Sequence, residues 1–210
     1  MTGNARFVWL NRALVVLGVV CLLFYSAATV STWRYQRDAK AAVSQMIAKP
    51  VAAANGKTAP TAPPALKKGD LIGRVDIPRI KLSAAIAEGD DDTTLGKAVG
   101  HLPDTPFPWH RRGNVAFAAH RDGLFRKLEH VRIGDLVHVV TIRGEFQYRV
   151  TKTQIVEPSD LSVLKPTKTP TVTLITCYPF SFIGNAPRRF VVQAEMADAA
   201  GTALKGSVVR

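Results

Sequence analysis

Cys177 is the residue of this sequence with the clearest capacity for chemistry. It closes the run Thr173–Cys177, TLITC, and the other cysteine, Cys21, lies in an apolar stretch near the start of the sequence. Because Cys177 has no second cysteine in its own part of the chain, a structural disulfide is excluded there. The thiol is therefore either inert and buried or kept for reactivity, and a reactive thiol acts as a thiolate nucleophile.

A cysteine that transfers acyl groups also needs a proton donor and a positive group beside it. Residues 170–180 contain no His, Lys or Arg, so these partners must come from distant parts of the chain. His120 follows the apolar run Val115–Ala119, where the end of a rigid strand can position a functional side chain. Its position alone is equally typical of a strand-end histidine bonded to backbone. The other histidines lie in loop or surface contexts: His101, His110, His130 and His138.

Two adjacent arginines are candidates for the positive group. Arg188 and Arg189 precede the apolar run Phe190–Ala194 and are the only Lys or Arg between Lys168 and Lys205. Because successive residues of a strand face opposite sides, one arginine can point at a site while the other is solvated. A basic strand edge that resists aggregation is the alternative interpretation.

The elements that would position these residues have the pattern of short strands. Alternating or β-branched runs separated by Gly and Pro favour an all-β barrel or sandwich with only short helices. The strand-like runs are Leu71–Pro78, Gly113–Ala119, Asp135–Thr141, Glu145–Thr151, Thr171–Cys177 and Phe190–Ala194. Residues 142–144 are expected to form a hairpin loop, and Leu124–Leu128 is the expected short helix.

An uncharged apolar segment, Ala13–Val30, precedes these strands. Together with Phe7–Leu10 it is long enough to cross a bilayer core of about 30 Å, and basic and aromatic residues flank it on both sides. A cleaved signal peptide is the alternative, although the apolar stretch is long for one. The sequence therefore predicts one N-terminal transmembrane helix, residues 1–33, with the lipid bilayer as a partner.

The chain between this anchor and the strands is expected to serve as a spacer. Residues 34–48 contain good helix formers, Lys49 and Pro50 interrupt them, and residues 50–66 have little to bury. We therefore expect residues 34–69 to form a juxtamembrane helix and an Ala/Pro-rich linker that holds a domain off the membrane. The catalytic domain is predicted over residues 70–196, followed by a flexible tail over residues 197–210.

The distribution of charge narrows the choice of partners. The net charge is +12, and the first 65 residues hold seven Lys or Arg against one Asp, beside the apolar segment where they would meet anionic lipid. The remainder of the chain is only mildly basic, and it lacks a run of basic residues interleaved with aromatic ones. This composition argues against nucleic acid as a binding partner. One short segment contains four acidic residues, and their spacing is not that of a calcium-binding loop. We therefore expect this segment to form a solvated turn, and we expect neither a metal nor a cofactor. The acidic residues of this segment are Glu88, Asp90, Asp91 and Asp92.

Three motifs together resemble the sortases, the cysteine transpeptidases of bacterial surfaces. TLITC resembles the TLxTC signature that ends in the catalytic cysteine, and Asn114–Arg121 resembles the segment around the catalytic histidine. Arg189–Val192 resembles the arginine-plus-apolar strand near the C-terminus of the family. The motifs follow the family order over roughly residues 70–195, and the continuation Cys-Tyr-Pro-Phe is most similar to class D. Ala119 stands where many sortases have glycine.

This resemblance implies a fold and a role for each candidate residue. The fold would be a closed β-barrel of about eight strands, with the site at the ends of the central strands. Cys177 would be the nucleophile, His120 the general acid and base, and Arg189 the group that stabilises the oxyanion or the substrate.

The same resemblance implies where a peptide would bind. Thr176, Ala119 and Tyr178, the neighbours of the catalytic pair, are expected to contact the substrate, although Thr176 is equally typical of a plain strand threonine. From its polar, Pro-containing composition between two strands, Glu157–Thr169 is expected to form a wall of the peptide groove, with Pro179–Pro187 as a second flanking loop.

The reaction implied is acyl transfer from an exported protein with a C-terminal sorting motif similar to Leu-Pro-x-Thr-Gly. The enzyme would cut after Thr, hold the product as a thioester on Cys177 and pass it to an amine acceptor, a cell-wall peptide or a pilin lysine. The N-terminus would lie inside a bacterial plasma membrane and the catalytic domain outside. A hydrolytic cysteine peptidase and a non-catalytic peptide-binding barrel stay open as alternatives.

Overall fold

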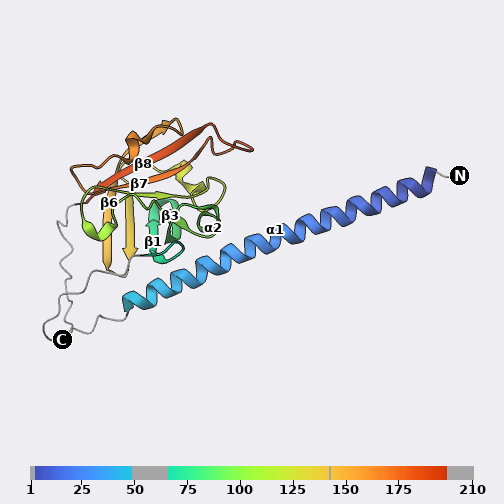
Figure 1. Cartoon of the computed structure of the whole chain (residues 1–210), viewed down its shortest axis with the longest axis horizontal. Helices are drawn as coiled ribbons and strands as arrows, with labels where there is room; N and C mark the ends of the chain where they lie inside the picture. The colour runs from blue at the N-terminus through green and yellow to red at the C-terminus, as the bar shows by residue number, and fades with distance from the viewer. Residues whose placement is uncertain (1–2, 49–65, 142, 198–210) are drawn as a thin grey trace.

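The computed structural model describes residues 3–48, 66–141 and 143–197, and most of the expected linker and tail lie outside these residues. A long helix comes first and eight strands follow (Figure 1). The strands are β1 Leu71–Ile77, β2 Leu82–Glu88, β3 Val99–His101, β4 Asn114–Ala118, β5 Leu136–Thr141, β6 Gly144–Val156, β7 Thr171–Tyr178 and β8 Arg188–Met196. The helices are α1 Gly3–Ala48, α2 Asp92–Leu95 and the 3-10 helices η1 Pro78–Ile80, η2 Pro108–His110, η3 Arg126–His130 and η4 Leu161–Leu164.

The eight strands close into one barrel in the order β1-β2-β3-β4-β7-β8-β6-β5, which confirms the predicted fold class. The pairs β2–β3 and β4–β7 are parallel, and the other pairs are antiparallel. The expected hairpin is present, with Thr141 opposite Gly144. The sequence patterns did not predict β2 and β3, and the expected short helix is η3, which begins two residues later than predicted.

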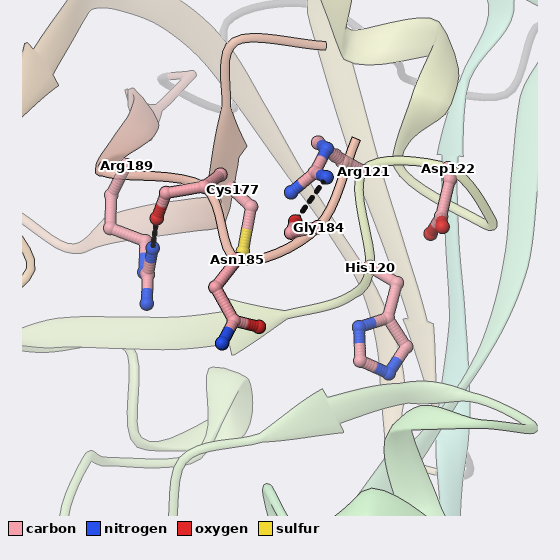
Figure 2. A pocket seen from close by; sticks show the side chains of 8 residues that line it. His120, Arg121, Asp122, Cys177, Gly184, Asn185 and Arg189 are labelled. Atoms are coloured by element: carbon pink, nitrogen blue, oxygen red, sulfur yellow. Dashed lines mark hydrogen bonds between the residues drawn. The ribbon is translucent and has the colours of Figure 1, made fainter. Parts of the chain in front are cut away.

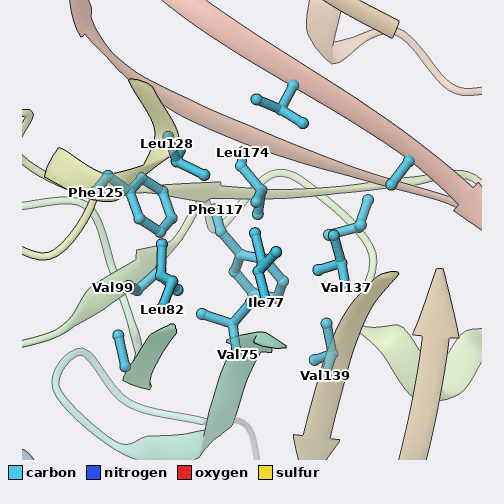
Figure 3. Packing of buried hydrophobic residues seen from close by; sticks show 14 of the residues in the cluster. Val75, Ile77, Leu82, Val99, Phe117, Phe125, Leu128, Val137, Val139 and Leu174 are labelled. Carbon is cyan, nitrogen blue, oxygen red and sulfur yellow. The ribbon is translucent and has the colours of Figure 1, made fainter. Parts of the chain in front are cut away.

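The core is the interior of the barrel. Alternate residues of the strands point inward, and the largest of them are fully enclosed (Figure 3). Phe117 on β4 and Leu174 on β7 lie in this interior, and Phe125 and Leu128 pack on it from the segment after His120. The segment that carries the candidate histidine is therefore anchored by buried side chains on both sides of the turn.

Helix α1 is 46 residues long, about 69 Å at 1.5 Å per residue. In the described part of the chain it is the one helix long and apolar enough to cross a membrane. Its apolar half is exposed, whereas Gln36, Ala39 and Val43 are buried against the barrel. These residues are spaced by three and four positions, so they share one face of the helix.

The juxtamembrane helix expected from residue 34 is the C-terminal part of α1 and contacts the barrel, whereas residues 49–65 of the expected linker lie outside the described residues. The Gln36 side chain accepts a hydrogen bond from the Ala85 backbone N–H at 2.9 Å and donates one to the Lys97 carbonyl at 2.7 Å. The Thr32 hydroxyl donates to the Gly96 carbonyl at 3.1 Å. The barrel therefore sits directly on α1, because the helix carries a docking face that the composition of the linker does not reveal.

A buried hydrogen-bonded pair replaces part of the expected acidic turn. His101 is fully enclosed, and its Nδ1 lies 2.8 Å from Glu88 Oε2. Asp91 caps the N-terminus of α2 through its side chain. The expectation of a solvated turn is therefore wrong for Glu88, because strand pairing between β2 and β3 brings it opposite His101.

Candidate active site

One pocket contains all three residues proposed to do chemistry. It has a volume of about 310 Å³ and opens at the end of the barrel where β4 and β7 finish (Figure 2). It is lined by His120, Arg121, Asp122, Cys177, Gly184, Asn185, Ala186 and Arg189. Residues that are 69 positions apart in sequence, from His120 to Arg189, thus share one small surface.

Strand register explains this convergence. In the parallel pair of β4 and β7, Ala118 lies opposite Ile175. His120 and Cys177 each follow two residues later, so they emerge at the same end of the barrel. In the antiparallel pair of β7 and β8, Cys177 lies directly opposite Arg189. Cys177 is half-buried and unpaired, since Cys21 lies on the exposed part of α1.

The two adjacent arginines separate as the alternation of a strand requires. Arg189 lines the pocket, and its Nη1 donates to the carbonyls of Ala186 and Arg188 at 3.3 and 3.1 Å. The guanidinium of Arg188 lies 5.7 Å from the centre of the Tyr178 ring. Of the two, Arg189 is the one that faces Cys177 and His120.

The three residues expected to contact the substrate lie elsewhere. Thr176 and Ala119 are buried, at 2% and 5% exposure, and the Thr176 hydroxyl donates to the Ala119 carbonyl at 2.8 Å. Tyr178 is half-buried and lies beside Arg188 and Phe180. Of these, none is a lining residue of the pocket. Thr176 instead ties the end of β7 to the backbone directly before His120.

Arg121 is a site residue whose contacts the sequence patterns did not predict. Its Nη2 donates to the carbonyls of Phe182 and Gly184 at 2.6 and 2.8 Å, and Figure 2 shows it reaching Gly184. Arg126 adds a bond from Nη1 to the Phe180 carbonyl at 3.0 Å. Hydrogen bonds from charged donors contribute about 1.5–3 kcal/mol each. The loop Pro179–Pro187 is therefore fastened to the segment that follows His120.

Asn185 is the second unforeseen residue. It belongs to the same loop, and Figure 2 shows its side chain extending into the space between His120 and Arg189. The signal for both residues was present in the sequence: an arginine follows His120 directly, and the loop after Cys177 is uncharged from Pro179 to Pro187. Neither pattern predicts which backbone carbonyls accept hydrogen bonds from the arginine.

The arrangement supplies the groups that acyl transfer through a cysteine requires. A thiol can act as the nucleophile, an imidazole can donate and accept protons, and a guanidinium can neutralise a developing oxyanion. A closed barrel with these groups at the mouth defines a candidate cysteine acyl-transfer site.

Comparison with known proteins identifies the family of this chain. A family model described as the sortase domain matches residues 75–197. Sortase D of Bacillus subtilis is 37% identical over 125 residues, which cover 59% of this chain and 63% of that protein. This chain therefore belongs to the sortase family, and the predicted similarity to class D is confirmed.

Solved structures agree with this assignment. The structure of a Clostridium perfringens Sortase D5 transpeptidase is 30% identical, with a TM-score of 0.57, over 63% of this chain and 82% of that one. A sortase C of Clostridium perfringens, solved with the C-terminal cell wall sorting motif, is 27% identical with a TM-score of 0.58, over 64% and 74%. The chain spans between half and two thirds of the length of the curated relatives it matches.

Proposed function

We propose that this protein is a membrane-anchored cysteine transpeptidase that acts on exported proteins with a C-terminal sorting motif of the Leu-Pro-x-Thr type. The observation that carries the proposal is the convergence of Cys177, His120 and Arg189 in one pocket of a sortase barrel. The sorting motif bound to the Clostridium perfringens sortase C supports the class of substrate.

In the first half of the proposed reaction, the thiolate of Cys177 attacks the carbonyl carbon of the motif threonine. Negative charge develops on the carbonyl oxygen, and the Arg189 guanidinium neutralises it. The C–N bond then breaks, and protonated His120 gives its proton to the departing amine. The products are a thioester on Cys177 and a free peptide that begins with the residue after threonine.

In the second half, an amine acceptor attacks the thioester carbonyl. Neutral His120 takes the proton from the attacking amine, the C–S bond breaks, and the thiolate of Cys177 is regenerated. The acceptor in this proposal is a cell-wall peptide or a pilin lysine. Water would give a carboxylic acid instead, and the hydrolytic alternative differs from the proposal at this step alone.

The proposed location is a bacterial plasma membrane, with α1 as a single span. Phe7 to Val30 provides the apolar length, and basic and aromatic residues on both sides fit the two interfaces. The N-terminus would lie inside and the barrel outside, because sorting-motif substrates and amine acceptors are exposed on that side.

The test uses the full chain in detergent with a sorting-motif peptide, with and without an amine acceptor, and product masses as the readout. We expect an amide-linked product that contains the acceptor, and no cleavage with Cys177→Ala. Hydrolysed peptide alone would favour the peptidase. Binding without cleavage by the wild type would favour the non-catalytic barrel, and cleavage by Cys177→Ala at the wild-type rate would end the catalytic interpretation of this thiol.

A further inference from the structure

An exposed apolar pair lies at the tip of the loop between β7 and β8. Phe182 is 44% exposed and Ile183 is 95% exposed. The loop, Pro179–Pro187, contains no charged side chain. A tip of this composition gains free energy by leaving water, so it fits an apolar or interfacial partner.

The loop cannot easily withdraw this pair into the protein. Arg121 binds the carbonyls of Phe182 and Gly184, on both sides of Ile183, and Arg126 binds the carbonyl of Phe180. The opposite side of the loop is occupied, because Gly184, Asn185 and Ala186 line the pocket. The loop thus has one side that faces the site and a tip that is held outward.

The position of α1 fixes the barrel relative to any bilayer that the helix spans. The apolar segment ends at Val30, and the Thr32 hydroxyl already bonds the Gly96 carbonyl at 3.1 Å. At 1.5 Å per residue, Thr32 lies about 3 Å beyond Val30 along the helix. Because Gln36 and Val43 are buried in the same interface, the edge of the barrel at Gly96 lies beside the lipid headgroups.

The loop projects to the side of the barrel on which such a bilayer would lie. In Figure 1 the orange-red segment between β7 and β8 leaves the barrel on the side toward which the N-terminal half of α1 runs. The pocket opens at this end of the barrel, since it lies where β7 finishes and β8 begins. The aromatic ring of Tyr178 and the exposed Arg188 flank the loop, a pairing typical of membrane interfaces.

We propose that the β7–β8 loop contacts the lipid interface through Phe182 and Ile183, so that the mouth of the pocket faces the membrane surface. The inference rests on the membrane anchoring in the proposed function. Two side chains suffice because α1 already tethers the loop to the bilayer, which makes the contact intramolecular. A substrate that is still held in the membrane would then present its motif at the level of the pocket.

A spin label measures this contact without any catalysis. The full chain carries Cys21→Ser and Cys177→Ala, together with Ile183→Cys labelled with a nitroxide, in nanodiscs of phosphatidylcholine and phosphatidylglycerol. The matched control is Leu161→Cys, which is 67% exposed on η4. That helix lies toward the opposite end of the barrel, because the neighbouring Val163 carbonyl accepts a bond from Asn114 at the start of β4.

We expect the label at 183 to be accessible to dissolved oxygen and shielded from a water-soluble nickel complex, and the label at 161 to show the reverse. Equal exposure of both labels to the nickel complex would overturn the inference. Dipolar coupling between labels at 183 on two chains, with no lipid contact, would assign the tip to a second copy and would also overturn it.

Activity provides the second measurement. In vesicles of the same lipids, Ile183→Asp should lower transfer from a lipid-anchored sorting peptide by about tenfold, since the loop loses its tethered contact. Because Ile183 belongs to the loop expected to flank the peptide groove, the readout is the ratio of this rate to the rate with a soluble peptide in detergent, and this ratio should fall about tenfold relative to the wild type. If the wild type transfers neither peptide, the proposed function fails while the label still reports on the loop. If the ratio of the two rates is the same in Ile183→Asp as in the wild type, the loop inference fails alone.

Discussion

Cys177 and Arg189 lie directly opposite each other in the antiparallel pair of β7 and β8. This pairing places the guanidinium beside the thiol as a consequence of backbone register, without a dedicated hydrogen bond between the side chains. The next pair along, Tyr178 and Arg188, points the other way, and the second arginine lies over the Tyr178 ring. At the start of β8, two adjacent arginines therefore lie in different environments, one in the pocket and one over an aromatic ring.

The first prediction follows from this separation. Arg189→Ala should lower kcat/KM for a sorting-motif peptide by at least about 100-fold, because removal of one oxyanion-stabilising group costs that much in other acyl-transfer sites. Arg188→Ala is the matched control and should retain activity within a small factor. Steady-state kinetics on both variants decides the question, and equal losses would mean that the two arginines contribute only positive charge to this strand end.

Arg121 should act as a positioning residue. Both bonds come from Nη2 at the end of the Arg121 side chain, and Arg121→Lys keeps the charge on a shorter side chain, so it should lose at least one of the two loop carbonyls. We expect faster hydrogen exchange in residues 179–187 and kcat/KM lower by about tenfold, carried mainly by KM if the loop forms a wall of the groove. Arg149→Lys, which breaks a remote bond to the Gly134 carbonyl, is the control. The role fails if exchange in the loop is unchanged.

Much of the fold was accessible from the sequence, and its gaps have local causes. Strand β4 carries a continuous apolar run and β7 and β8 carry β-branched or aromatic runs, whereas β2 is rich in alanine and β3 has three residues. Neither of these two strands has the alternation that identifies a half-buried strand, and the parallel pairing of β2 with β3 is not encoded in a local pattern. The closed barrel was therefore predicted with two of its strands unidentified.

The site shows the same division between chemistry and geometry. Residue types and motif order indicated Cys177, His120 and Arg189, because few side chains can perform these roles. They did not reveal that Thr176 bonds the Ala119 carbonyl, or that Arg121 and Asn185 reach the pocket. The contacts of Arg121 and Asn185 depend on where the loop Pro179–Pro187 folds back, and such a turn has no periodic pattern to detect.

Acid should weaken the junction between η1 and β5. The bond from Arg79, together with the Arg132 backbone N–H at 2.8 Å, holds the pKa of Asp135 below its ordinary value. Because the folded pKa lies below the unfolded pKa of about 3.9, this contribution is complete above about pH 5 and is lost as the pH falls through the folded pKa. Asp135→Asn should lower the Tm at pH 7 and flatten its fall between pH 5 and 2. An unchanged slope would exclude Asp135 as a source of acid sensitivity.

Gln36 should hold the barrel on α1. Its amide satisfies the Ala85 N–H and the Lys97 carbonyl, and the residue is 7% exposed, so Gln36→Ala leaves two partners unpaired at a cost of about 1–3 kcal/mol each. The loss should appear as undocking before any unfolding of the barrel, since the barrel strands do not depend on the amide. Hydrogen exchange in nanodiscs should show faster exchange at Ala85 with β7 unchanged. Gln45→Ala, at an exposed position of the same helix, is the control. If β7 exchanges faster as well, the contact with α1 stabilises the fold of the barrel itself, and the prediction of simple undocking is wrong.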